Sequence, residues 1–185
     1  NPRQVLDPSD PVSIGAMVGP EAFTEVKYLN HVRMLDSLDS IKRASVDFNE
    51  IFGRNSGGSL RTYNLDGAET VIVALGSILG TIKDLVDVLR TEGGAIGVIG
   101  ITSFRPFPYK ELREHLKHAK RVIVLEKAFQ TGVGGIVTED VNRSLAGLAV
   151  ERSTVIAGLG GRPITTASLR KHIESAIVGE VSDTT

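Results

Sequence analysis

Four residues of this sequence are candidates for binding an anion: Gly76, Ser77, Arg105 and Arg162. Gly76 and Ser77 separate an apolar run from an amphipathic segment, which predicts a strand-to-helix turn. Amides that open a helix can bind an anion, although Ser77 can instead accept their hydrogen bonds and cap the helix. Because every βα unit makes such a turn, a plain connection is the simpler interpretation.

The two arginines lie in loops of unusual composition. Arg105 lies in residues 103–108 (SFRPFP), where two prolines stiffen the backbone, after an apolar run. Sites in α/β sheets gather at the carboxyl ends of strands, but an anchor or interface corner is the favoured role here. Arg162 ends residues 158–162 (GLGGR), and a guanidinium can bind a carboxylate or phosphate through two hydrogen bonds. A tight turn, with Arg162 paired to a carboxylate elsewhere, is the favoured interpretation.

Other patterns argue against a catalytic centre in the chain. The glycines at 132–135 follow a strand and open a helix, as in dinucleotide fingerprints, but the position that should be small is Val137. His115 and His118 are three residues apart with no third metal ligand in view. No serine has the surroundings of a nucleophile elbow. The sequence therefore predicts no catalytic residue and no metal site.

Composition excludes several classes of protein. A net charge of −1 over 185 residues gives no electrostatic footprint for nucleic acid. No apolar run has the length of a membrane span, and no basic-then-apolar leader is present. With no cysteine, the chain cannot form disulfides or ligate iron–sulfur clusters. We expect a cytoplasmic protein, and because the first residue is Asn1, a piece of a longer or processed chain.

The order of apolar segments predicts an α/β sheet. Residues 71–108 give a strand, a helix and a second strand, a unit whose crossover is right-handed in nearly all proteins. Strands are expected at 61–65, 71–75, 95–101, 121–125 and 153–157. Before them we expect an extended proline-rich arm (1–20) and a long helix (21–56) that packs on the α/β domain (57–180), with a possible break near residues 36–40.

Motifs spread over residues 5–177 resemble, in one order, those of the pyruvate (2-oxoacid):ferredoxin/flavodoxin oxidoreductases. FRPFP at 104–108 and GLGGR at 158–162 are specific as a pair at this separation. The other matching positions are Asp7-Pro8, 11–15 (PVSIG), Tyr28, 52–54 (FGR), 74–77 (ALGS), Gly80-Thr81 and 124–127 (VLEK).

The resemblance is to domain II of the α subunit or fused chain, whose fold is that of the transketolase carboxyl-terminal domain. It implies a three-layer α/β/α sandwich with a five-stranded mixed sheet in the order 1-3-2-4-5. The first strand would be antiparallel and would form the polar edge.

The resemblance also implies a function. The family oxidatively decarboxylates a 2-oxoacid to an acyl-CoA with thiamine diphosphate, Mg, iron–sulfur clusters and CoA, and passes electrons to ferredoxin or flavodoxin. The only candidate for the Gly-Asp-Gly run of a thiamine diphosphate site is Leu65-Asp66-Gly67, where leucine stands in place of the first glycine. The cluster cysteines are absent. The chain is therefore expected to be a non-catalytic assembly domain, inactive alone, that binds other domains or subunits.

Two alternatives stay open. One is the carboxyl-terminal domain of another thiamine diphosphate enzyme, a transketolase or a 2-oxoacid dehydrogenase β subunit. The other is a free-standing module that binds an anion or nucleotide at Gly76-Ser77 or at 132–135.

Overall fold

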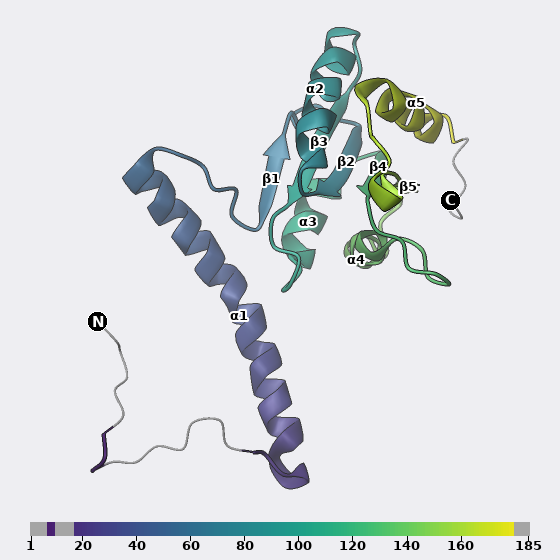
Figure 1. Ribbon diagram of the computed structural model, residues 1–185. Helices are drawn as coiled ribbons and strands as arrows, with labels where there is room; N and C mark the ends of the chain where they lie inside the picture. The colour runs from purple at the N-terminus through teal and green to yellow at the C-terminus, as the bar shows by residue number, and fades with distance from the viewer. Residues whose placement is uncertain (1–6, 10–16, 180–185) are drawn as a thin grey trace. The chain divides into compact units, whose positions relative to one another are not determined.

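A computed structural model describes residues 7–9 and 17–179 (Figure 1). The chain divides into two compact units, residues 1–36 and 37–185, which are described separately. Helix α1 (Pro20–Phe52) runs unbroken through residues 36–40, where a break was possible. The expected arm lies mostly outside the described residues, and the division into arm, long helix and α/β domain stays a prediction.

The second unit is built on the expected five-stranded sheet. Its strands are β1 (Leu60–Tyr63), β2 (Thr70–Leu75), β3 (Ile96–Ile101), β4 (Arg121–Glu126) and β5 (Glu151–Ile156). Their order is β1-β3-β2-β4-β5. Only β1 is antiparallel, and it pairs with β3 in the register Leu60↔Ile101. The sheet order and the polar antiparallel edge are therefore confirmed.

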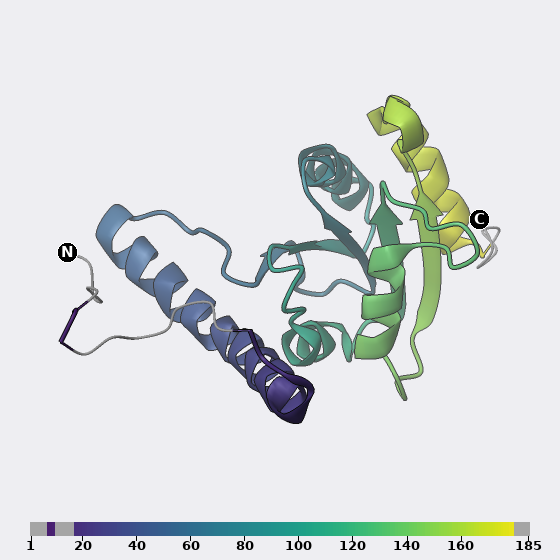
Figure 2. The same ribbon diagram turned by 60° about the horizontal axis from the view of Figure 1, so that its bottom comes forward.

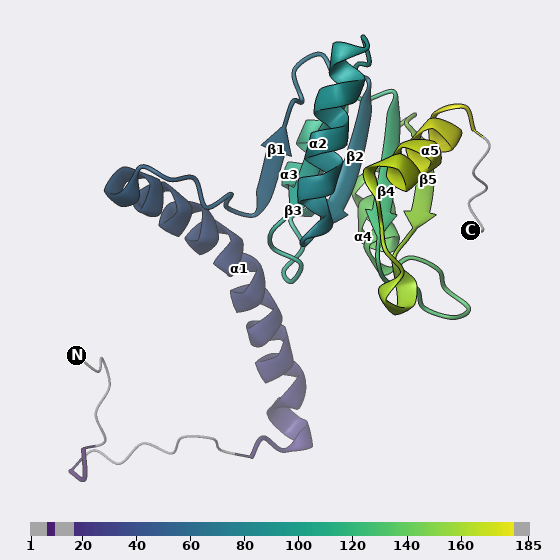
Figure 3. The same cartoon turned by 45° about the horizontal axis from the view of Figure 1, so that its top comes forward.

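Helices cover both faces of the sheet and complete the three layers. Helices α2 (Ile78–Thr91) and α5 (Thr166–Ile177) lie on one face (Figure 3). Helices α3 (Tyr109–Leu116) and α4 (Ile136–Ser144) lie on the other, with the sheet between the two pairs (Figure 2). A short 3₁₀ turn, η1 (Leu159–Gly161), precedes α5.

The central strands are buried on both faces because their side chains alternate between two cores. Val73 and Val124 contribute to the core under α3 and α4. Ile72 and Ile123, one residue earlier in each strand, contribute to the core under α2 and α5. This double burial explains why the strands read as unbroken apolar runs rather than as alternating patterns. No helix in the described part of the chain is both long and apolar enough to cross a bilayer.

A glycine in β3 allows the loop before β2 to approach the sheet closely. A Cβ atom placed on Gly97 would lie 2.6 Å from the backbone oxygen of Asn64. Arg90, near the end of α2, fastens the same loop by donating hydrogen bonds to the backbone oxygens of Asn64 and Asp66. The β1–β2 connection is thus held in place by backbone contacts that a larger side chain at Gly97 would displace.

Candidate functional site

A pocket at the carboxyl edge of the sheet brings together two of the regions that the sequence singled out. It has a volume of about 260 Å³ and is lined in part by Ser77, Thr81, Lys127 and Arg162. Ser77 precedes α2, Lys127 directly follows β4, and Arg162 follows η1. Strands β2, β4 and β5 are neighbours and parallel, so the segments that follow them meet at one edge.

The start of α2 opens into this pocket without a side-chain cap. The predicted capping role of Ser77 is not observed, because Ser77 has helical backbone angles and its side chain accepts no hydrogen bond from the helix amides. No acidic residue lies in the first turn of α2. The turn itself depends on Gly76, whose φ of 82° is in the left-handed region that favours glycine.

The two cations of the pocket have no counterion in the described part of the chain. Neither Lys127 nor Arg162 makes an ion pair there, and no carboxylate is among the described lining residues. The Lys127 side chain passes close to the turn before η1: a Cβ atom on Gly158 would lie 3.0 Å from Lys127 Cε. The glycine-rich turn before η1 therefore leaves the space that the lysine side chain crosses.

The other glycine-rich loop, at 132–135, leads to a helix start that is already occupied by a carboxylate. Buried Glu126 accepts hydrogen bonds from the amides of Val137 at 2.9 Å and Thr138 at 3.1 Å, and from the Thr138 hydroxyl at 2.6 Å. A Cβ atom on Gly135 would overlap with this carboxyl group. The protein's own anion takes the place of a phosphate at α4, which disfavours nucleotide binding there.

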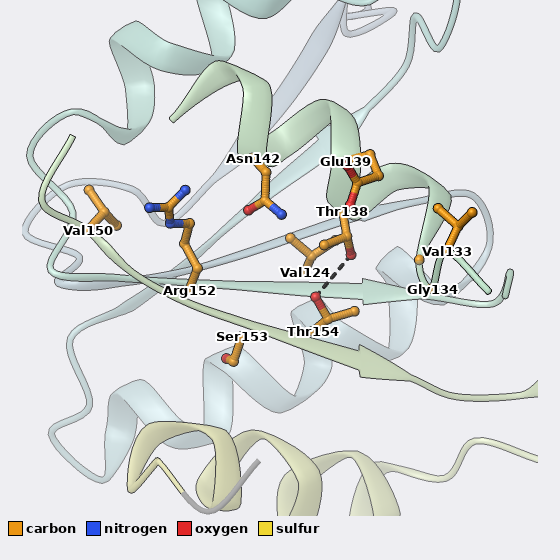
Figure 4. A pocket seen from close by; sticks show the side chains of 11 residues that line it. Val124, Val133, Gly134, Thr138, Glu139, Asn142, Val150, Arg152, Ser153 and Thr154 are labelled. Atoms are coloured by element: carbon orange, nitrogen blue, oxygen red, sulfur yellow. Dashed lines mark hydrogen bonds between the residues drawn. The ribbon is translucent and has the colours of Figure 1, made fainter. Parts of the chain in front are cut away.

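A second, larger depression lies between α4 and the edge strand β5 (Figure 4). It measures about 560 Å³, and Glu139, Asn142 and Arg152 point into it. Thr138 and Thr154 join its two sides through hydroxyl oxygens 3.0 Å apart. Ser153, whose buried hydroxyl has no hydrogen-bond partner among the described residues, points to the opposite face of the strand. The groove has one cation and one anion, so it has no charge preference for a ligand.

Arg105 lies away from the cationic pocket and has a structural partner. Its Nη1 atom lies 2.8 Å from Asp140 Oδ2, and the Tyr109 hydroxyl donates to the other oxygen of the same carboxylate at 2.5 Å. Burial, and then the hydrogen bond and charge of Asp140, raise the pKa of Tyr109 above its usual value. The Ser103 hydroxyl donates to the backbone oxygen of Pro106 and ties the FRPFP corner together.

The described residues of this chain do not supply ligands for the iron–sulfur clusters or the metal ion that its resemblance implies. Iron–sulfur clusters need cysteine ligands, and the sequence has none. Among the described residues, no group of three His, Asp or Glu side chains could hold a metal ion. His115 and His118 instead line a separate pocket at the opposite end of the sheet, beside Lys120. No catalytic step in this chain is therefore assigned to an iron–sulfur cluster or a metal ion.

Two residues of the carboxyl edge were missed by reasoning from sequence. Glu126 and Lys127 were noted only as part of a family motif, and neither was assigned a role. A signal was present: a carboxylate at the end of an apolar run, followed by a glycine-rich loop and a helix, is placed to cap that helix. Lys127 then follows at the edge where binding residues gather.

Comparison with known proteins gives consistent results. A family model described as "Pyruvate:ferredoxin oxidoreductase core domain II" matches residues 68–169. "Pyruvate synthase subunit PorA" of Methanosarcina barkeri is 40% identical over 178 residues, covering 94% of this chain and 44% of that protein. The subunit of the same name from Methanothermobacter thermautotrophicus is 35% identical over 176 residues, covering 95% of this chain and 44% of that protein. The chain thus spans less than half the length of these relatives.

A solved structure shares the fold. The 2-oxoglutarate:ferredoxin oxidoreductase of Magnetococcus marinus superposes with a TM-score of 0.51 at 21% sequence identity, covering 71% of this chain and 21% of that one. At this identity the likeness supports the fold alone.

Proposed function

The chain belongs to the pyruvate:ferredoxin oxidoreductase core domain II family, and from that premise we propose that it is a non-catalytic assembly domain of a 2-oxoacid:ferredoxin oxidoreductase. The whole enzyme would oxidatively decarboxylate a 2-oxoacid to an acyl-CoA, and the names of the relatives support pyruvate as the substrate. Thiamine diphosphate, Mg, iron–sulfur clusters and CoA would be bound by other domains or subunits. Electrons would pass to ferredoxin or flavodoxin, and we expect a cytoplasmic enzyme.

The observation that carries this proposal is the exposure of helix α1. None of its 33 residues is buried, although it carries many large apolar side chains. Tyr28, Val32 and Leu35, here called the α1 stripe, follow the i, i+4, i+7 spacing that places side chains on one side of a helix. Tyr28 is 68% exposed and Leu35 44% exposed.

Other apolar side chains of α1 point in different directions around the helix. Phe23 and Leu29 are each about half exposed, and Ile51 and Phe52 are more exposed than that. A helix that is apolar on several sides is typical of one surrounded by protein, and isolated helices gain most of their stability from packing. These features support an interface between α1 and the rest of the enzyme. In the relatives, more than half of the subunit's length lies outside the part that this chain matches.

The proposal is tested by placing a charge on the α1 stripe in the full-length subunit, expressed with its partner subunits. Leu35→Asp should shift the mass distribution, measured by mass photometry, from complex to free subunit. Asn30→Asp is the matched control, since it adds the same charge at an exposed position of the same helix outside the stripe. Pyruvate-dependent reduction of a viologen dye should fall with the assembled fraction, while the activity per assembled complex stays unchanged.

Two outcomes would contradict the assembly role. One is an unchanged mass distribution for Leu35→Asp. The other is pyruvate-dependent dye reduction by the 185-residue chain alone, because a domain that turns over substrate is not a passive one.

The family assignment favours this function over the carboxyl-terminal domain of a transketolase or of a 2-oxoacid dehydrogenase β subunit. Those proteins share the expected sheet, so the fold alone does not separate them. The match that separates them is the domain II model, which covers the sheet from before β2 to within α5.

A further inference from the structure

The cationic pocket at the carboxyl edge carries an inference beyond assembly. We propose that it binds the phosphate group of a small molecule between Lys127, Arg162 and the start of α2. The three groups come from three separate segments that the sheet brings to one place. The site needs no residue of α1 and is independent of the proposed assembly role.

Charge is the first argument. Lys127 and Arg162 line one pocket, and neither has an ion-pair partner among the described residues. Two cations that line one pocket without a carboxylate give it a positive potential, and that potential attracts an anion. Elsewhere in this domain cations near carboxylates are paired, as Arg105 is with Asp140. This pocket is distinguished by having two cations and no carboxylate among its described lining residues, whereas the groove between α4 and β5 is lined by both Glu139 and Arg152.

The polar groups around the cations fit a phosphate better than a carboxylate. The start of α2 adds about half a positive charge, so with Lys127 and Arg162 the pocket matches a doubly charged anion. Ser77 and Thr81, one helical turn apart, contribute hydroxyl groups that can donate to further oxygens. Arg162 can bind two phosphate oxygens at once. A tetrahedral dianion can use donors from all of these directions.

The size of the pocket limits how much of the ligand it encloses. About 260 Å³ lies below the range of roughly 300–1,000 Å³ that is typical of sites enclosing a whole drug-sized ligand. The pocket therefore encloses a phosphate group and leaves the organic part of the molecule outside. Inorganic phosphate is for this reason an adequate probe of the site.

The Lys127 side chain lies against the turn that leads to Arg162. Its stem crosses the turn at Gly158, where a Cβ atom would lie 3.0 Å from Lys127 Cε and 2.8 Å from Ile164 Cδ1. Gly158 also has a φ of 78°, in the left-handed region. The glycine therefore serves both the turn that presents Arg162 and the path of the lysine side chain.

The first test measures binding of radiolabelled inorganic phosphate to the full-length protein by equilibrium dialysis. Lys127→Met and Arg162→Gln should each weaken saturable binding about tenfold or more, because each removes a charge-assisted hydrogen bond. Lys171→Met is the matched control: it removes the same charge from an exposed position on α5. Binding that is absent, or equally weakened by all three substitutions, would overturn the proposal.

The second test locates the site without relying on a substitution. Acylation of lysines by an amine-reactive reagent is followed by mass spectrometry, with and without phosphate. Phosphate should slow the labelling of Lys127 and leave that of Lys171 unchanged. The assembled enzyme gives a further check, made before phosphate is added. If Lys127 is already unreactive there, a partner subunit covers the lysine and supplies its anion, and the proposal is overturned. Neither measurement depends on turnover or on the α1 stripe.

Discussion

The buried carboxylate of Glu126 accepts hydrogen bonds from amides at the start of α4, and removing it should lower the free energy of unfolding. Glu126 is buried at 3% exposure and accepts hydrogen bonds from two consecutive backbone amides and one hydroxyl. Glu126→Ala leaves the amides of Val137 and Thr138 without their acceptor, while the Thr138 hydroxyl keeps a neighbour in Thr154 at 3.0 Å. Each amide left unsatisfied costs about 1–3 kcal/mol.

Because the adjacent groove is open to water on the side of Thr138, one of the two amides can be partly solvated. We therefore expect a total loss of about 2–4 kcal/mol in the free energy of unfolding. For a unit of this length that corresponds to a fall of roughly 4–16 °C in the melting temperature. Glu126→Gln keeps the shape and one acceptor, so it should cost less, about 1–3 kcal/mol.

The assay combines thermal unfolding with hydrogen–deuterium exchange read peptide by peptide. Exchange should accelerate in α4 and much less in α2, because the lost acceptor serves only the start of α4. Glu139→Gln is the control, since Glu139 is an exposed carboxylate in the first turn of the same helix. Equal melting temperatures for wild type and Glu126→Ala, with unchanged exchange in α4, would refute the reasoning.

Two further predictions concern backbone space and pH. Gly97→Ala should destabilise the protein by about 1–3 kcal/mol in urea unfolding, because the new Cβ would lie 2.6 Å from the Asn64 backbone oxygen. Gly80→Ala, in the first turn of α2 where a Cβ meets open space, should instead stabilise the protein by up to about 0.5–1 kcal/mol. An equal effect at both sites would contradict the contact at Gly97. Burial raises the pKa of Glu111, but hydrogen bonds from Lys42 and Ser59 and the charge of Lys42 outweigh it and hold the pKa below its ordinary value of 4.5. Because the folded pKa is depressed, the ionised carboxyl contributes stability above that value that is lost as the pH falls through the folded pKa. The free energy of unfolding of wild type and Glu111→Gln is compared by urea unfolding as the pH is lowered from above 4.5 to below it. The advantage of wild type should shrink with acidification, and a constant difference would be evidence against the ion pair between Lys42 and Glu111.

Much of the fold is predictable from sequence because local patterns and the global sheet agree. The run from Val71 to Leu75 has no alternation, and the structure buries Val71 to Ala74 under helices on both sides, while Leu75 at the end of the strand is exposed. Gly93 ends α2 with a φ of 92°, and Thr165 caps α5 as part of a capping box. These features depend on residues within one or two helical turns, so the sequence determines them directly.

The partners of individual side chains are less accessible, because they depend on the packing of distant elements. Ser77 precedes a helix as expected but does not cap it, since a helical backbone at Ser77 turns the residue into the helix. Arg105 pairs with Asp140, 35 residues away. The meeting of Ser77 with Arg162 follows from the placement of β2, β4 and β5 side by side, which the family resemblance implied and periodicity did not.

The contribution of α5 to the sheet has a consequence for synthesis on the ribosome. Leu169 and Ile173 complete the core that also contains Ile72 and Ile123, which belong to strands that are translated earlier. Until α5 leaves the exit tunnel, only α2 covers that side of the central strands. The nascent chain is therefore expected to expose the part of this apolar face that Leu169 and Ile173 cover until α5 has been translated and has docked, and this exposed surface favours aggregation in the interval.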